Sequence, residues 1–168
     1  MKQTSEDTSQ LHTVNIFNLE IGSPFWKQFD FWLAIVAAVV FYFVFIFFSV
    51  ANILPVRSIE LSYFFVISLI AFPIMEEVVF RGLIQESLQQ LLTNYQLRKI
   101  VVYRLSSANL VCSVLFAASH LVSQPWTWAL LMFFPSIIFG YFKDKYQSLK
   151  PAIILHIFYN MGFYFLLG

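Results

Sequence analysis

The chain of 168 residues is 60% hydrophobic and 20% aromatic, but only 11% of its residues are charged and its net charge is +1. An ordinary soluble domain carries about 25% charged residues, and a domain of this length still exposes roughly 30% of its unfolded surface. The composition therefore excludes a typical soluble domain, a disordered chain and a nucleic-acid-binding protein, and it favours a membrane protein.

The N-terminal part of the chain predicts a polar arm followed by a first transmembrane helix. Residues 1–28 are polar to mixed in character, and we expect a single membrane domain over 29–168. No charged residue lies between Asp30 and Arg57, and residues 31–50 are almost wholly apolar. A run of this length can cross a bilayer as one helix.

A second apolar segment carries an acidic pair. It begins near Leu61, includes Glu76 and Glu77, and remains apolar to about Ile84. In residues 82–95, Leu and Ile recur at helical spacing with Gln and Glu between them. This pattern predicts an amphipathic helix at the membrane interface.

The C-terminal half predicts three further helices. The uncharged stretch 105–142 is too long for one crossing, and residues 123–125 (Ser-Gln-Pro) interrupt it. We therefore expect helices over 105–122 and 126–142, followed by a last helix over 151–167. The expected fold is all-α, with about five transmembrane helices and one interfacial helix.

The basic residues predict the orientation, because cytoplasmic loops of membrane proteins are enriched in Lys and Arg. Five crossings place the N-terminal arm and the connections at 85–104 and 143–150 on one side. The opposite side holds only Arg57, whereas this side holds eight basic residues: Lys2, Lys27, Arg98, Lys99, Arg104, Lys143, Lys145 and Lys150. We expect a cytoplasmic N-terminus and a C-terminus outside the cell.

Polar side chains inside the expected helices mark the candidate site, because an ionisable group at membrane depth costs about 2.5 kcal/mol or more. Glu77 and Arg81 are four residues apart and can pair on one helix face, so we interpret them as a supporting ion pair. The alternative is a buried ion cluster that only holds helices together. Glu76 points about 100° away from Glu77 and has no cation four residues further on.

The other candidate residues offer groups suited to hydrolysis. Glu76 and His120 supply a carboxylate and an imidazole, which suffice to activate a water molecule. His156 and Asn160 are four residues apart and present two donors to one point, as a developing oxyanion requires. An inter-helix hydrogen bond is the alternative for that pair. Glu76, His120 and His156 could equally bind zinc with one open position.

The depths of two of these residues conflict in a straight-helix model. At 1.5 Å per residue, that model separates Glu76 from His120 by roughly 10–15 Å along the membrane normal. A tilted or broken helix must close this gap if the two residues act together.

Three motifs stand in order along the chain: residues 76–81 read EEVVFR, residues 116–120 read FAASH and residues 156–160 read HIFYN. They resemble the EExxxR, FxxxH and HxxxN motifs of the CPBP family. That family comprises CAAX prenyl endopeptidases of the Rce1 type and bacterial bacteriocin-processing or Abi proteins. The resemblance covers the motif core at 61–168.

The resemblance implies an intramembrane endopeptidase of the glutamate type in a bacterial plasma membrane. Glu76 matches the catalytic glutamate of the family, and His120 matches the histidine that helps to orient the water. His156 and Asn160 match the pair that stabilises the oxyanion. Glu77 and Arg81 match the supporting pair.

The expected substrate is a membrane-associated peptide or protein, cut near the membrane boundary at a leader or a C-terminal sorting tag. Lipid bilayer is the other expected partner, and nucleic acid is not. We expect no metal or other cofactor, because the chain has no HExxH motif; a zinc metallopeptidase is the alternative. A non-enzymatic bacteriocin self-immunity protein, with the motifs as a polar core, is the alternative function.

Overall fold

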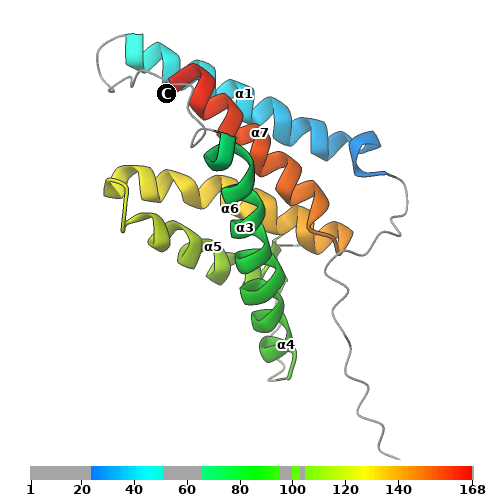
Figure 1. The fold of residues 1–168 in the computed structure, drawn as a ribbon. Helices are drawn as coiled ribbons and strands as arrows, with labels where there is room; N and C mark the ends of the chain where they lie inside the picture. Colours follow the sequence, from blue (N-terminus) through cyan, green and yellow to red (C-terminus); the bar gives the residue numbers. More distant parts are fainter. Residues whose placement is uncertain (1–23, 51–65, 95–99, 103–104, 168) are drawn as a thin grey trace, which may run out of the picture.

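The computed structural model describes residues 24–50, 66–94, 100–102 and 105–167, and these residues are mainly helical (Figure 1). The all-α prediction is confirmed. The elements in chain order are the 3-10 turn η1 (Phe25–Lys27), α1 (Phe29–Val50), the π-helical η2 (Ile67–Ala71), α3 (Phe72–Glu77), the π-helical η3 (Val78–Gln85), α4 (Glu86–Asn94), β1 (Ile100–Val102), β2 (Leu105–Ser106), α5 (Ser107–His120), α6 (Trp126–Tyr146) and α7 (Lys150–Leu167).

The observed helices agree with the predicted segments to within a few residues at most ends. α5 is shorter than predicted, because residues 105–106 pair with β1 in a two-stranded antiparallel sheet that the sequence did not indicate. Residues 1–23 of the predicted arm and residues 61–65 of the predicted second helix lie outside the described part of the chain. Among the helices that the structure describes, none has the length and apolar character that a membrane crossing requires, so the five crossings are not confirmed.

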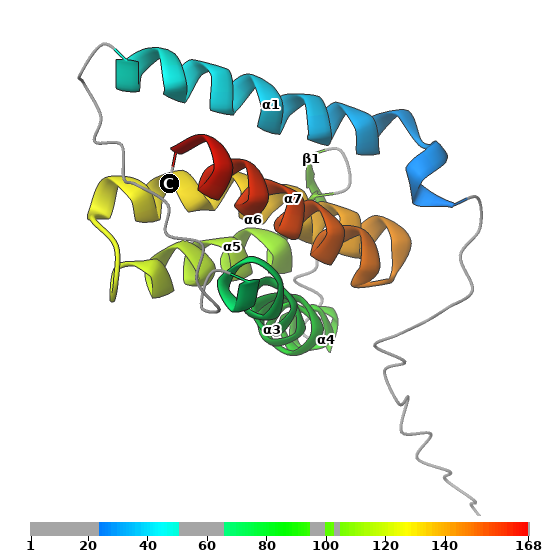
Figure 2. The same ribbon diagram turned by 45° about the horizontal axis from the view of Figure 1, so that its top comes forward.

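One long helix runs across the others. It is built from η2, α3, η3 and α4, which follow one another without a break from Ile67 to Asn94. Figure 1 shows this green helix crossing α5 and α6, and Figure 2 shows it almost end-on beside α5. Its α3 part packs against α7, and its η3 part packs against α5. The crossing brings the middle of this helix against two others.

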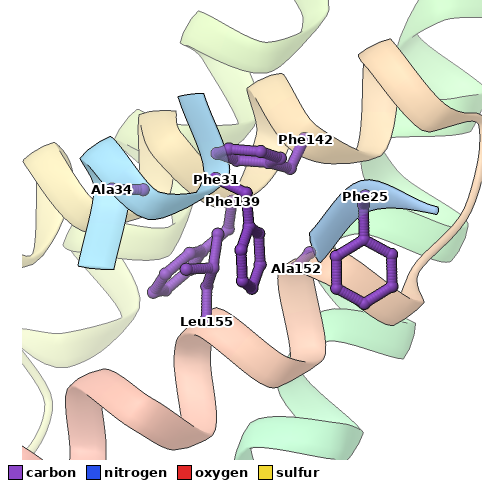
Figure 3. Close-up of a cluster of buried hydrophobic side chains, with 7 residues drawn as sticks. All are labelled: Phe25, Phe31, Ala34, Phe139, Phe142, Ala152 and Leu155. Atoms are coloured by element: carbon purple, nitrogen blue, oxygen red, sulfur yellow. The ribbon is translucent and has the colours of Figure 1, made fainter. Parts of the chain in front are cut away.

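An apolar core joins α1, α6 and α7 (Figure 3). Its buried members are Phe25, Phe31, Ala34, Phe139, Phe142, Ala152 and Leu155. Burial of one large apolar side chain stabilises a fold by about 1.5–3 kcal/mol. The ring of Phe139 also stacks on the His156 imidazole, with 4.7 Å between ring centroids. The core therefore extends directly to a candidate site residue.

α5 and α6 approach each other closely at a glycine. A Cβ atom on Gly140 would lie 2.0 Å from Oδ1 of Asn109, so only glycine fits there. The buried Asn109 side chain donates from Nδ2 to the carbonyl of Ile137 at 3.0 Å and accepts from Ser113 Oγ at 3.1 Å. These polar residues of α5 thus serve helix packing.

Two lysines of the basic 143–150 segment form ion pairs between helices. Lys143 pairs with Glu86 of α4, and Lys145 pairs with Asp30 of α1. The Tyr141 hydroxyl also donates to Asp30 Oδ2 at 2.9 Å. Burial favours the neutral acid at Asp30, but the Lys145 ammonium and the Tyr141 hydroxyl outweigh it and lower the Asp30 pKa below its ordinary 3.8.

Candidate functional site

Glu77 and Arg81 form the ion pair that their spacing predicts. Arg81 Nε lies 3.4 Å from Glu77 Oε2, and both side chains are fully buried. The pair lies where α3 continues into η3, with one residue in each segment. A buried charge is tolerated when it is paired and hydrogen-bonded, and each member here compensates the other.

Further partners hold the Arg81 guanidinium from α5, α6 and its own helix. Nη2 donates to the Ser136 carbonyl oxygen at 2.9 Å and also to the Ser136 hydroxyl. Nη1 donates to Gln85 Oε1 at 3.3 Å and contacts Cys112 Sγ at 3.4 Å. The guanidinium is therefore held in a defined position between three helical segments.

The His156 imidazole lies between the two glutamates. Its Nδ1 is 2.9 Å from Glu77 Oε1, and its Nε2 is 3.5 Å from Glu76 Oε2. Because α3 packs against α7, these three residues from distant parts of the chain meet at one point. The sequence paired Glu77 with Arg81 alone, so the contact with His156 was missed.

The protons at His156 follow from the chemistry of its partners. A carboxylate oxygen only accepts, so Nδ1 is assigned the hydrogen that it donates to Glu77. Nε2 faces a second carboxylate, and that contact is favourable only when one proton lies on Nε2 or on Glu76. The imidazole is thus held by Glu77 at Nδ1 and faces Glu76 with Nε2.

The two glutamates differ in their exposure. The Glu77 side chain is fully buried, whereas 34% of the Glu76 side chain is exposed. Glu77 is already paired with Arg81 and accepts from His156 Nδ1, so both its oxygens face protein groups. Glu76 retains a carboxylate oxygen that water or a peptide can reach.

His120 lies near Glu76 in the folded chain, as joint action of the two residues requires. The two side chains interact electrostatically, and the Phe116 ring contacts the rings of both His120 and His156, with centroids 4.7 and 5.8 Å away. The straight-helix model assumed parallel helices, whereas the helix that carries Glu76 crosses α5 at a steep angle (Figure 1). The crossing allows the Glu76 and His120 side chains to approach each other.

One nitrogen of His120 is committed to its own helix. Nδ1 lies 2.9 Å from the Phe116 carbonyl oxygen, which can only accept, so Nδ1 is assigned the hydrogen. In the neutral imidazole, Nε2 then carries a lone pair. His120 thus offers a basic nitrogen beside Glu76.

Asn160 lies on α7 one turn after His156, and its side chain is partly exposed. This agrees with the prediction that the two residues share one face of the last helix.

The three suggested zinc ligands do not form one converged group in the described part of the chain. Within the described ranges, no three His, Cys, Asp or Glu side chains converge as metal ligands. The Nδ1 bonds of His156 to Glu77 and of His120 to the Phe116 carbonyl leave Nε2 of each ring as the nitrogen through which a metal could bind.

Three further polar residues near the site were missed by sequence reasoning. Ser136 and Gln85 are fully buried and bond Arg81, and Asp144 bonds Gln85 at 2.8 Å. Gln85 is four residues after Arg81, so its helical spacing was an available signal. Ser136 and Asp144 lie on α6, and nothing in their local sequence points to η3.

Comparison with known protein families gives a match over most of the chain. The model of the family described as type II CAAX prenyl endopeptidase Rce1-like matches residues 58–162, which include all six candidate residues. No curated protein and no solved structure shows significant similarity to the chain.

Proposed function

The chain belongs to the Rce1-like family of type II CAAX prenyl endopeptidases, and we propose that it hydrolyses a peptide bond with a water molecule activated by Glu76. Membership in this family implies a protease, and the family's proteases are membrane proteins. The observation that carries the proposal is the unequal pair of glutamates, one buried and neutralised and the other open beside two imidazoles.

Glu76 has the properties of a general base. Its neighbour Glu77 is compensated by Arg81 and His156, so these groups do not require Glu76 for charge balance. Its partly exposed carboxylate can take a proton from a water molecule while the oxygen of that water attacks a peptide carbonyl carbon. Glu76 then returns that proton to the leaving amine.

His120 orients the water. Its Nδ1 is anchored on the Phe116 carbonyl, which fixes the ring and leaves Nε2 as an acceptor. A water molecule that donates one hydrogen to Glu76 and the other to His120 has its lone pairs directed away from both groups. General base catalysis of this kind contributes about 10²–10⁴-fold.

His156 and Asn160 stabilise the oxyanion. The bond from Nδ1 to Glu77 holds the imidazole, as an orienting carboxylate does in a catalytic triad. Nε2–H of the protonated ring and the Asn160 amide are then the two donors. Losing one donor of this type costs about 10²–10³-fold in turnover.

The proposed substrate is a membrane-associated peptide or protein, and the proposed setting is a bilayer. Large apolar side chains on α1, α5 and α6 are exposed, among them Phe43, Phe47, Val114 and Phe134. Exposed apolar area on this scale marks contact with lipid or another apolar partner. Cleavage near the membrane boundary and a bacterial plasma membrane remain part of this proposal.

The test compares purified wild type with Glu76→Gln on a library of membrane-anchored peptides. Gln is nearly isosteric, so folding should survive while turnover falls by about 10²–10⁴-fold. Glu86→Gln is the matched control, because it makes the same change on the same long helix outside the site, and it should keep wild-type turnover. Cleavage by Glu76→Gln at the wild-type rate would end the proposal.

The same assay separates the alternatives. A metallopeptidase would lose activity with a chelator and regain it with added zinc, whereas the proposed enzyme is unaffected by either. A non-enzymatic immunity protein would cleave no peptide and would keep its biological activity in Glu76→Gln.

A further inference from the structure

We propose that Gln85 and Asp144 are positioning residues, which act through Arg81 and Glu77 to hold His156 in its catalytic orientation. The proposal rests on the proposed function of the Glu76 site. Gln85 contacts the supporting residue Arg81, and Asp144 lies on a different helix, near the far end of α6.

Four polar residues form a row along the crossing helix at intervals of four: Glu77, Arg81, Gln85 and Gln89. In a regular α-helix, each step of four residues would rotate the row by about 40°. The π-helical η3 has i→i+5 bonds and therefore more residues per turn, which counteracts this rotation. The row can then face α5 and α6 along its whole length.

The Gln85 amide has one permitted orientation. Its Oε1 accepts from Arg81 Nη1 at 3.3 Å, and its Nε2 donates to Asp144 Oδ1 at 2.8 Å and to the Gly140 carbonyl at 3.2 Å. A flipped amide would direct donor at donor and acceptor at acceptor. The fully buried side chain cannot exchange these partners for water.

The Asp144 carboxylate sets that orientation and is itself held by three segments. Oδ1 accepts from Gln85 of η3 and from Gln89 of α4, and Oδ2 accepts from the Ser106 hydroxyl of β2 at 2.7 Å. Only 10% of its side chain is exposed. The crossing helix is therefore tied to α6 at this point.

The contacts continue from Asp144 to the imidazole of His156 through hydrogen-bond acceptors and donors that alternate along the row. Asp144 orients Gln85, Gln85 supplies an acceptor to Arg81, Arg81 pairs with Glu77, and Glu77 accepts from His156 Nδ1. If the guanidinium loses one acceptor, Glu77 and the His156 ring shift with it. A displacement of 1 Å at a catalytic group can cost about 10²-fold in rate.

The experiment uses Gln85→Met, which keeps the side-chain length and removes the amide. Its control is Asn109→Leu, which removes another fully buried amide at the α5–α6 contact, outside this row. We expect Gln85→Met to lower kcat about 10–100-fold with KM unchanged. Asn109→Leu should lower the melting temperature and leave kcat unchanged.

A spectroscopic measurement tests the same link without turnover. The chain has three histidines, so ¹⁵N-histidine NMR of the detergent-solubilised protein is simple to assign with His12→Gln and His120→Gln. Gln85→Met should move the His156 nitrogen signals and leave those of His120 in place. Asp144→Asn keeps the side-chain shape and removes the charge, so it should move the His156 signals in the same direction by less. It also serves if Gln85→Met fails to fold.

The outcomes separate the two proposals. If the wild type cleaves nothing, the proposed function fails, and the His156 signals alone decide whether Gln85 and Asp144 position the ring. If the signals and kcat of Gln85→Met both match the wild type, the positioning role is wrong. A fall in melting temperature with unchanged His156 signals would likewise overturn it, because it shows a purely structural role.

Discussion

Removal of the Arg81 charge should reveal whether the site is dry. We expect Arg81→Met, which retains much of the side-chain volume, to lower the free energy of unfolding by about 3–5 kcal/mol. The reason is that Glu77 is fully buried and would lose the Arg81 guanidinium that pairs with it. Among the described residues, a protonated His156 would be the other nearby cation. The bond from His156 Nδ1 to Glu77 survives and limits the loss.

A double variant distinguishes an unpaired charge from lost packing. Glu77→Gln combined with Arg81→Met removes both charges, and replacing a buried pair by neutral groups is often neutral or stabilising. We expect the double variant to recover most of the loss, which corresponds to a favourable coupling energy in a double-mutant cycle. The assay is unfolding by SDS titration in mixed micelles.

Lys143→Met is the matched control. Lys143 is also a buried cation, but its nearer partner Glu86 is 23% exposed and can be solvated when unpaired. Its more distant partner Asp144, at 3.8 Å, keeps its hydrogen bonds from Gln85 and Ser106. The loss in Lys143→Met should therefore be nearer ~1 kcal/mol. If Arg81→Met unfolds within about 0.5 kcal/mol of the wild type, water reaches Glu77 and the reasoning is refuted. A double variant that loses the sum of the single losses would refute it as well.

Three further predictions concern regions outside the site. Gln147 ends α6 in the left-handed conformation with φ 49°, so Gln147→Gly should raise the melting temperature by relieving about 1 kcal/mol of strain, and Gln147→Ala should not. Because the Asp30 pKa is lowered, its bonds to Lys145 and Tyr141 stabilise the fold above the unfolded pKa and lose this effect as pH falls through the folded value. The wild type should therefore be more stable than Asp30→Asn at pH 6, and the difference should begin to shrink near pH 3.8 and disappear only below the folded pKa, which is lower. Reporter fusions should place the C-terminus outside the cell and Lys145 in the cytoplasm, and a cytoplasmic C-terminus would contradict this orientation.

Contacts within one helix could be predicted from the sequence. The spacing of Glu77 and Arg81 predicted their ion pair, and the spacing of His156 and Asn160 predicted a shared face on α7. Helical periodicity and the Ser-Gln-Pro interruption also predicted most helix boundaries. These features depend on the helical period of 3.6 residues per turn and on residues that interrupt a helix. Both can be recognised from residues that are close together in the sequence.

Contacts between helices were decided by the tertiary structure. The bond between His156 and Glu77, the approach of His120 to Glu76 and the link from Gln85 to Asp144 each join distant segments. They depend on the steep crossing of the long helix over its neighbours, which no single helix encodes (Figure 2). Crossing angles arise from the packing of two surfaces, so a small change in either one turns a polar side chain toward a different partner. The sequence by itself therefore determined the candidate residues and the contacts within each helix, and only the packing of the helices determined which of these residues meet.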